Sequence, residues 1–341
     1  MTKLAMNPLE RMQRRLKGQV VDRPPNFDIF MTMAAHQIDQ PLSAYYSDYR
    51  VLVAANMAML EAFDLDIVQA ISDPFRETAD FGAVVEFPDD DLPLCRRPLL
   101  EQPEDLSQLE APEPGSGRRM SDRLSAVRSF REQVGRQVPV MGWVEGALAQ
   151  AADLRGVMDL MMDLVRRPEW VAELLEICVG VEIAFAQAQI EAGADIIGLG
   201  DAVASLISPE MYRRFGLPYE QRVFVAVHEM GALARLHICG DTTHILDDMV
   251  KSGADIIDLD WKVDMSAAAE KFGDQVSFCG NFDPVAVMLH GTADQVYAAT
   301  QACMRSGGPR SISAAGCEIP DGTPPANLHA QAQALGDLAA L

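Results

Sequence analysis

His237 and Cys239 are the first residues whose types and spacing indicate chemistry. They lie in a short, mostly apolar run, residues 233–239, which is followed by Gly240. Side chains two positions apart on an extended strand point to the same side, so an imidazole and a thiolate would face one direction. Both groups are ligands of zinc and similar divalent metals. Taken alone, the pair fits either a metal site at a strand end or a core strand that contains a His and a Cys.

Cys317 favours the metal site over the core strand. It follows a second strand-like run, residues 311–315, in a similar setting at the end of that run. Three protein ligands that leave one coordination place open are typical of a catalytic zinc site, whereas a structural zinc usually takes all four ligands from the protein. The sequence therefore predicts a catalytic metal site.

Composition excludes several classes of function. The chain has 341 residues, of which 49% are hydrophobic and 23% charged, and its formal net charge is −22. Such a charge would repel nucleic acid and anionic membrane surfaces. No apolar run approaches the roughly 18 residues that span a bilayer, and residues 1–10 lack the apolar segment of a signal peptide. Six cysteines without dense spacing do not indicate a disulfide framework. We predict a cytoplasmic globular protein.

Strand-like and helical segments alternate along the chain. Residues 9–17 form the pattern of an amphipathic helix that ends at Gly18, and helical stretches separate the strands that follow. Alternation of this kind implies parallel pairing with crossover connections. We predict one α/β domain over residues 1–341, a (β/α)8 barrel. An open doubly wound sheet is the alternative, but no G-x-G-x-x-G follows the first strand. The eight predicted strands are 27–33, 66–71, 139–144, 195–199, 233–239, 255–260, 276–279 and 311–315. The predicted helical stretches are 154–164, 169–191, 209–230, 243–252, 265–272 and 292–305.

Residues 87–119 differ from the rest in composition. The segment is rich in proline and acidic residues, and six prolines preclude a long helix there. We predict an extended insertion within the barrel. It either covers the substrate or forms a surface for a partner. The alternative is a solvated linker with no functional role.

In a (β/α)8 barrel the chemistry collects at the carboxyl ends of the strands, and polar residues follow seven of the eight predicted strands. Asp260 ends the strand next to that of His237, and it is a candidate fourth metal ligand or the partner of the second nitrogen of His237. A rim aspartate in solvent is the alternative. The candidate catalytic residues are Glu145, Asp201 and Asn281. Glu145 and Asp201 could bind polar substrate atoms or handle a proton. Asn281 could donate to the substrate, or it could cap the loop before Asp283. The candidate substrate-binding residues near the mouth are Trp143, Ser205 and Phe282.

Three motifs together resemble the uroporphyrinogen decarboxylase superfamily: 237–243 (His-Ile-Cys-Gly-Asp-Thr-Thr), 280–284 (Gly-Asn-Phe-Asp-Pro) and 315–327 (Ala-Gly-Cys-Glu-Ile-Pro-Asp-Gly-Thr-Pro-Pro-Ala-Asn). More narrowly, they are similar to its zinc-dependent branch of corrinoid-linked methyltransferases, whose signature is His-x-Cys followed by a distant Cys. Here 77 residues lie between Cys239 and Cys317. The resemblance implies a (β/α)8 barrel, a Zn²⁺ bound by His237, Cys239 and Cys317, and a partner corrinoid protein that carries a cobamide. It also implies transfer of a methyl group between that cobamide and either a thiol or a methyl ether.

Two alternatives use the same barrel. A metal-free decarboxylase of the superfamily would need the arginine-rich N-terminal motif that holds substrate carboxylates, and residues 30–36 contain no arginine. The net charge of −22 would also repel a porphyrinogen with many carboxylates. The second alternative is a barrel without catalysis, in which the metal only stabilises the fold. The sequence leaves open the substrate, the direction of transfer and the oligomeric state.

Overall fold

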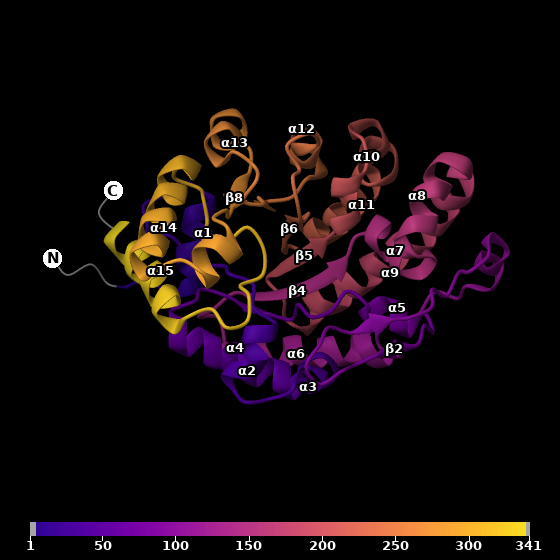
Figure 1. Ribbon diagram of the computed structural model, residues 1–341, viewed down its shortest axis with the longest axis horizontal. Coiled ribbons are helices and arrows are strands. Elements are labelled where there is room, and N and C mark those ends of the chain that lie inside the picture. The colour runs from indigo at the N-terminus through magenta and orange to yellow at the C-terminus, as the bar shows by residue number, and fades with distance from the viewer. Residues whose placement is uncertain (1–4, 339–341) are drawn as a thin grey trace.

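A parallel sheet of six strands forms the centre of the computed structural model, which describes residues 5–338. Residues 1–4, which begin the segment considered for a signal peptide, and 339–341 lie outside that range. The strands pair in chain order, each with the next, and helices cover the outer face (Figure 1). The strands are β1 (Val68–Gln69), β4 (Val140–Glu145), β5 (Ile196–Gly200), β6 (Leu233–His237), β7 (Ile256–Asp258) and β8 (Ser277–Cys279).

The first and last predicted strands complete the barrel through isolated bridges. Asn26 pairs with Ser313, and Cys279 of β8 pairs with Ile312, all in parallel. The Asn26 carbonyl accepts a hydrogen bond from the N–H of Asp66, which precedes β1. The predicted (β/α)8 barrel is therefore confirmed, although these two strands are shorter than expected. One reason is that the Asp28 side chain accepts the N–H of Ala315, a bond that a regular ladder would give to a carbonyl.

Helices return the chain from the carboxyl end of one strand to the start of the next. The predicted stretches at 154–164 and 209–230 are each interrupted, because Gly156 adopts a positive φ of 87° and the helix also breaks at Gly216. The helices that flank the sheet are α1 (Pro8–Leu16), α4 (Tyr49–Phe63), α6 (Arg118–Val134), α9 (Pro168–Ala192), α11 (Leu217–Glu229), α13 (Met265–Phe272), α14 (Ala293–Gly307) and α15 (Pro325–Asp337). Shorter helices are α2 (Thr32–Gln37), α3 (Leu42–Ser47), α5 (Arg76–Asp80), α7 (Ala147–Arg155), α8 (Val157–Arg166), α10 (Pro209–Phe215) and α12 (Leu246–Met249), with 3-10 turns η2 (Ala202–Leu206) and η3 (Val250–Ser252) and a π-helical turn η4 (Pro284–Leu289). Of these, α2–α6 and α15 are not among the predicted helices.

The barrel interior is filled by side chains from alternate strand positions. Met141 and Trp143 of β4, Ile196 of β5 and Ile256 of β7 belong to one buried cluster. Met12 of α1 joins the same cluster, so this helix closes the amino-terminal end of the barrel. The carboxyl-terminal end of the barrel is therefore the end at which a functional site can lie.

The insertion at 87–119 has little regular structure, in line with its prolines. It contains part of a small antiparallel hairpin, β2 (Val85–Glu86) with β3 (Leu94–Cys95), and a 3-10 helix, η1 (Pro103–Gln108). The N–H of Leu100 donates to the carbonyl of Leu154, and the indole N–H of Trp170 donates to that of Pro103. These bonds fix the insertion to α7 and to the start of α9.

None of the helices within residues 5–338 combines the length and the apolar character that crossing a bilayer would require.

Candidate metal centre

The side chains of His237, Cys239 and Cys317 converge at the carboxyl end of the barrel. Nε2 of His237 lies 3.1 Å from Sγ of Cys239 and 4.0 Å from Sγ of Cys317, and the two sulfurs are 3.8 Å apart. In a tetrahedral zinc site with ordinary bond lengths, ligand atoms are separated by roughly 3.5–3.8 Å. The described residues contain no other comparable group of three. Two thiols and an imidazole at these separations are close enough to share one divalent ion, and this donor set fits zinc.

Local structure explains why Cys239 faces the same point as His237. Strand β6 ends at His237, and Gly240 then adopts a φ of 89°, which an L side chain rarely reaches. The N–H of Gly240 donates to Oδ2 of Asp260 over 3.1 Å. The chain therefore turns directly after the cysteine and holds it at the mouth.

Asp260 has a different role from the one predicted. Its second carboxylate oxygen accepts the N–H of Lys262, so both oxygens hold backbone of the rim loops. The second nitrogen of His237 bonds instead to Asp258, with 2.7 Å between Nδ1 and Oδ2. The prediction that Asp260 orients His237 is thus wrong, and Asp260 is not part of the three-residue group.

Asp258 is in turn held by Arg235, which lies two positions before His237 on β6. The guanidinium Nε donates to Oδ1 of Asp258 over 2.8 Å, and both residues are buried. Burial alone would raise the pKa of Asp258, but the charge of Arg235 and the hydrogen bond from His237 lower it. An ionised Asp258 fixes the Nδ1–H tautomer and aims Nε2 at the thiols.

The Cys317 loop is anchored to the start of α2. Oε1 of Glu318 accepts hydrogen bonds from the N–H of Met31 and from the N–H and hydroxyl of Thr32. The N–H of Gly316 donates to the carbonyl of Phe282, whose side chain is buried in the core. Phe282, predicted to bind substrate, therefore supports the cysteine loop from below.

The two thiols differ in their electrostatics. The hydrogen bond from Cys239 lowers the pKa of Cys317 to about 4, although burial opposes the shift, and the same bond and burial raise the pKa of Cys239. A site that already favours one thiolate suits a divalent cation.

Glu145 ends β4 and Asp201 follows β5, the two strands that precede β6 in the sheet. Glu145 pairs in register with Gly200, which pairs with His237, and Asp201 follows β5 directly. Burial raises the pKa of each carboxyl to about 7, against the opposing charge of Arg76 for Glu145 and the N–H of Ala149 for Asp201. Arg76, which the sequence analysis did not identify, donates to Oε1 of Glu145 over 2.7 Å.

The other predicted residues take separate places. The two amide N–H groups of Asn281 donate to the carbonyls of Asp260 and Val263, so Asn281 fixes a rim loop and has no donor left for substrate, contrary to its predicted catalytic role. Ser205 lies beside Gly240 at the mouth. Trp143 is buried beneath the site, with its ring centroid 6.0 Å from that of His237.

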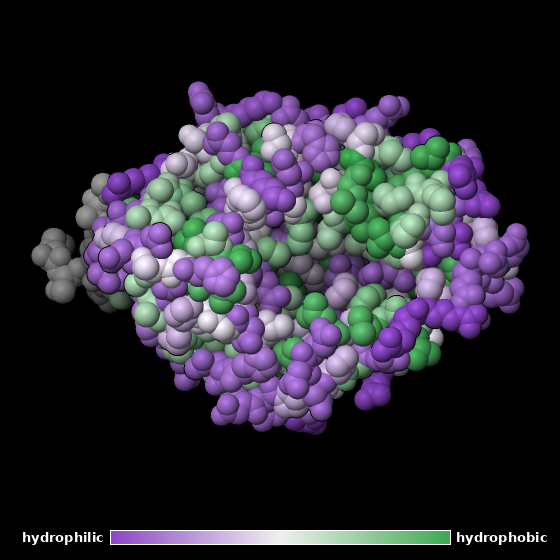
Figure 2. Space-filling view, in the orientation of Figure 1, coloured by the Kyte–Doolittle hydropathy of each residue, from purple (hydrophilic) through white to green (hydrophobic). Residues whose placement is uncertain are grey.

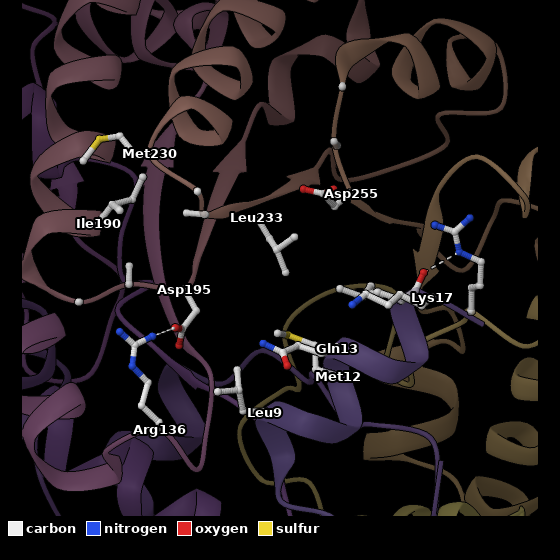
Figure 3. Close-up of a pocket in the computed structure, with 18 of the residues that line it drawn as sticks. Leu9, Met12, Gln13, Lys17, Arg136, Ile190, Asp195, Met230, Leu233 and Asp255 are labelled. Carbon is white, nitrogen blue, oxygen red and sulfur yellow. Dashed lines mark hydrogen bonds and ion pairs between the residues drawn. The ribbon is translucent and has the colours of Figure 1, made fainter. Parts of the chain in front are cut away.

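A large cavity lies at the opposite end of the barrel. It has a volume of about 1070 Å³ and is lined by α1 and by the starts of β5–β7, including Leu9, Asp195, Leu233 and Asp255 (Figure 3). Arg136 pairs with Asp195 there. This cavity contains none of the three candidate ligands.

The comparisons with known proteins agree with this geometry. The family model described as "Uroporphyrinogen decarboxylase (URO-D)" matches residues 7–337. The chain belongs to this family. It is 32% identical, over 94% of its own length and 95% of the relative's, to the methylcobamide:CoM methyltransferase MtbA of Methanosarcina mazei. It is 28% identical to the uroporphyrinogen decarboxylase of Nostoc punctiforme, over 80% of each chain.

A solved methyltransferase from Methanosarcina mazei superposes with a TM-score of 0.89 at 25% identity, over 97% of this chain and 99% of the other. These two methyltransferases match nearly the whole chain, whereas the decarboxylase of Nostoc punctiforme matches 80% of it. This member of the family is a methyltransferase.

Proposed function

We propose that this member of the uroporphyrinogen decarboxylase family is a zinc-dependent methyltransferase that works with a corrinoid protein in the cytoplasm. It moves a methyl group between the cobamide of that protein and the sulfur or oxygen of a small substrate, a thiol or a methyl ether. The proposal depends on one observation, the convergence of His237 Nε2 and the sulfurs of Cys239 and Cys317 within 4.0 Å. All six cysteines are free, which suits a reducing compartment.

His237, Cys239 and Cys317 would hold the zinc at the mouth of the barrel. When bound, zinc supplies Lewis acidity at an open coordination place, which favours a substrate thiolate or polarises a leaving oxygen. Asp258 keeps the imidazole oriented, and Arg235 keeps Asp258 charged. Trp143 closes the barrel below the site and so keeps water from entering it from that direction.

Glu145 and Asp201 are suited to hold the substrate proton. A carboxyl with a pKa of about 7 can accept a proton from a thiol near neutral pH and release it again. Arg76 holds the Glu145 carboxyl in one orientation, both with and without the proton.

The metal is tested first, because every other step depends on it. We expect about one zinc per chain in the purified protein, and loss of most of it in Cys239→Ser and Cys317→Ser. Cys95→Ser, which alters a cysteine of the insertion, is the matched control and should retain the metal. X-ray absorption at the zinc edge should give two sulfurs, one nitrogen and one exchangeable light atom. A closed shell of four protein ligands would instead indicate a stabilising metal.

The transfer is tested in both directions with free cobalamins. Methylcobalamin and a panel of small thiols, coenzyme M included, should give cob(I)alamin and a methyl thioether. Cob(I)alamin and methyl ethers should give methylcobalamin by O-demethylation. Transfer in neither direction by the zinc-loaded protein would refute the proposal, and decarboxylation of uroporphyrinogen would support the alternative.

A further inference from the structure

Exposed apolar side chains are concentrated around the barrel mouth. Within residues 5–338, twelve large hydrophobic side chains are exposed, and ten of them lie between the carboxyl end of a barrel strand and the helix that returns to the next strand. The two exceptions are Val20 and Val225. Isolated apolar residues are normal on a protein surface, but concentration at one end marks an interaction surface. The ten are Val84, Leu92, Leu94, Val157, Met158, Met162, Val165, Leu206, Trp261 and Val285.

Helix α8 contributes a continuous stripe to this surface. Met158, Met162 and Val165 are 80%, 42% and 72% exposed, and their spacing of four and three residues places them on one helical face. On the opposite face Leu160 and Leu164 are buried. Helix α8 thus has two apolar faces, and only one of them is covered by this chain. Figure 2 shows hydrophobic side chains near the place where Figure 1 labels α8 and α10, beside the central hollow.

Leu206 and Trp261 extend this surface to the candidate ligands. Leu206 is 65% exposed and follows Ser205, whose side chain lies next to Gly240 and so next to the Cys239 turn. Trp261 is 47% exposed, and its backbone N–H lies against Gly316, the residue before Cys317. One exposed apolar side chain therefore stands beside each thiol loop. The turn that carries Leu206 and helix α8 both pack against α7.

A large cofactor has to come to these thiols from outside. The cavity of about 1070 Å³ lies at the other end of the barrel, behind the buried cluster that contains Trp143, and so gives no access to the thiols. A cobamide that is carried by a protein must therefore be presented at the mouth, and the carrier must contact the residues around it. This step rests on the proposed function.

We propose that Met158, Met162, Val165, Leu206 and Trp261, here called the mouth rim, form the docking surface for the cobamide-carrying protein. The charge around the rim indicates the character of that partner. Residues 86–114, which pack against α7 and the start of α9, contain nine acidic residues and two arginines. The partner's docking face should therefore have an apolar centre with basic residues at its edge, and binding should weaken with salt.

The test separates docking from chemistry. The double variant Met158→Glu/Met162→Glu places two negative charges on the exposed stripe of α8. It changes neither a buried side chain nor a residue of the loops that carry Cys239 and Cys317. Its methyl transfer is measured with free methylcobalamin and, separately, with the corrinoid protein of the same organism, purified with its methylcobamide bound. Val225→Glu on α11 is the matched control, because Val225 is 57% exposed and lies outside the mouth segments.

We expect the double variant to keep its rate with free methylcobalamin and to raise KM for the corrinoid protein about tenfold or more, a loss typical of central interface residues. Val225→Glu should match the unaltered protein in both assays. Unchanged KM for the corrinoid protein in the double variant would overturn the docking surface while leaving the proposed function intact. Absence of transfer from either donor in the unaltered, zinc-loaded protein would overturn the proposed function itself.

Discussion

Asp258 on β7 binds Nδ1 of His237 on β6 across 2.7 Å, and this pair fixes the direction in which the imidazole presents Nε2. Adjacent parallel strands bring the two residues together, since Leu236 pairs with Ile257 one position before each. The candidate metal site therefore depends on strand register as well as on its three proposed ligands. Arg235 donates a hydrogen bond to the other carboxylate oxygen of Asp258 and so holds it in place.

We predict that Asp258→Asn lowers zinc affinity about 10–100-fold, because an amide removes the negative charge that orients and polarises the imidazole. Competition with a chromophoric chelator measures the change. Asp260→Asn is the matched control, since Asp260 holds backbone N–H groups, and its zinc affinity should change by no more than about threefold. The opposite ranking of the two variants would mean that Asp260 binds the metal.

Glu318 should be needed to hold the Cys317 loop in place. Glu318→Ala removes the acceptor of three hydrogen bonds from Met31 and Thr32, and we expect unfolding to become easier by about 1–3 kcal/mol. Zinc should still bind, more weakly than in the unaltered protein. Glu318→Gln keeps the Oε1 acceptor and should restore most of the stability in urea unfolding. Equal losses in both variants would assign the effect to charge rather than to these bonds.

Gly198 on β5 should be intolerant of a side chain. A Cβ at this position would overlap the six-membered ring of Trp143, which lies beneath His237. We predict that Gly198→Ala costs about 1–3 kcal/mol of stability and shifts the tryptophan emission, because the indole must move. Gly180→Ala on α9 meets no neighbour and should stabilise the protein by about 0.5–1 kcal/mol. Identical effects of the two variants would contradict the packing of Trp143 on the β5 glycines.

The sequence predicts the ligands because their chemistry is local, whereas the residues that support them depend on three-dimensional pairing. The spacing of His237 and Cys239 predicts that they share one side of a strand, and the same alternation would have placed Arg235 on that side too. In the structure β6 ends at His237, and Cys239 lies in the turn that follows. The choice between Asp258 and Asp260 could not be made in this way, because both fall on the same side of the predicted strand 255–260, although β7 ends at Asp258. Only the register of β6 with β7 brings Asp258 to His237.

The same distinction between local sequence and three-dimensional pairing applies to the strands and helices. Apolar runs identify the six paired strands, but the first and last strands are reduced to bridges by side chains such as Asp28, which bonds to backbone in place of a carbonyl. Glu145 is identifiable as a polar residue at a strand end. Its partner Arg76 is not, because it comes from α5, a short helix without a clear periodic pattern.

Glu182 on α9 should make stability fall as the pH rises. It is buried, neither of its carboxylate oxygens has a hydrogen-bond partner, and burial with the nearby charge of Asp201 raises its pKa well above 4.5. Between 4.5 and the folded-state pKa, the folded protein binds more protons at this group than the unfolded chain, so the free energy of unfolding decreases as pH increases. Glu182→Gln removes the titration, and we expect it to be more stable than the unaltered protein at pH 8, with a smaller difference at pH 4. Urea unfolding at the two pH values measures this. Glu173→Gln on the exposed face of the same helix should show no such change, and an equal pH response in both variants would exclude Glu182 as the source.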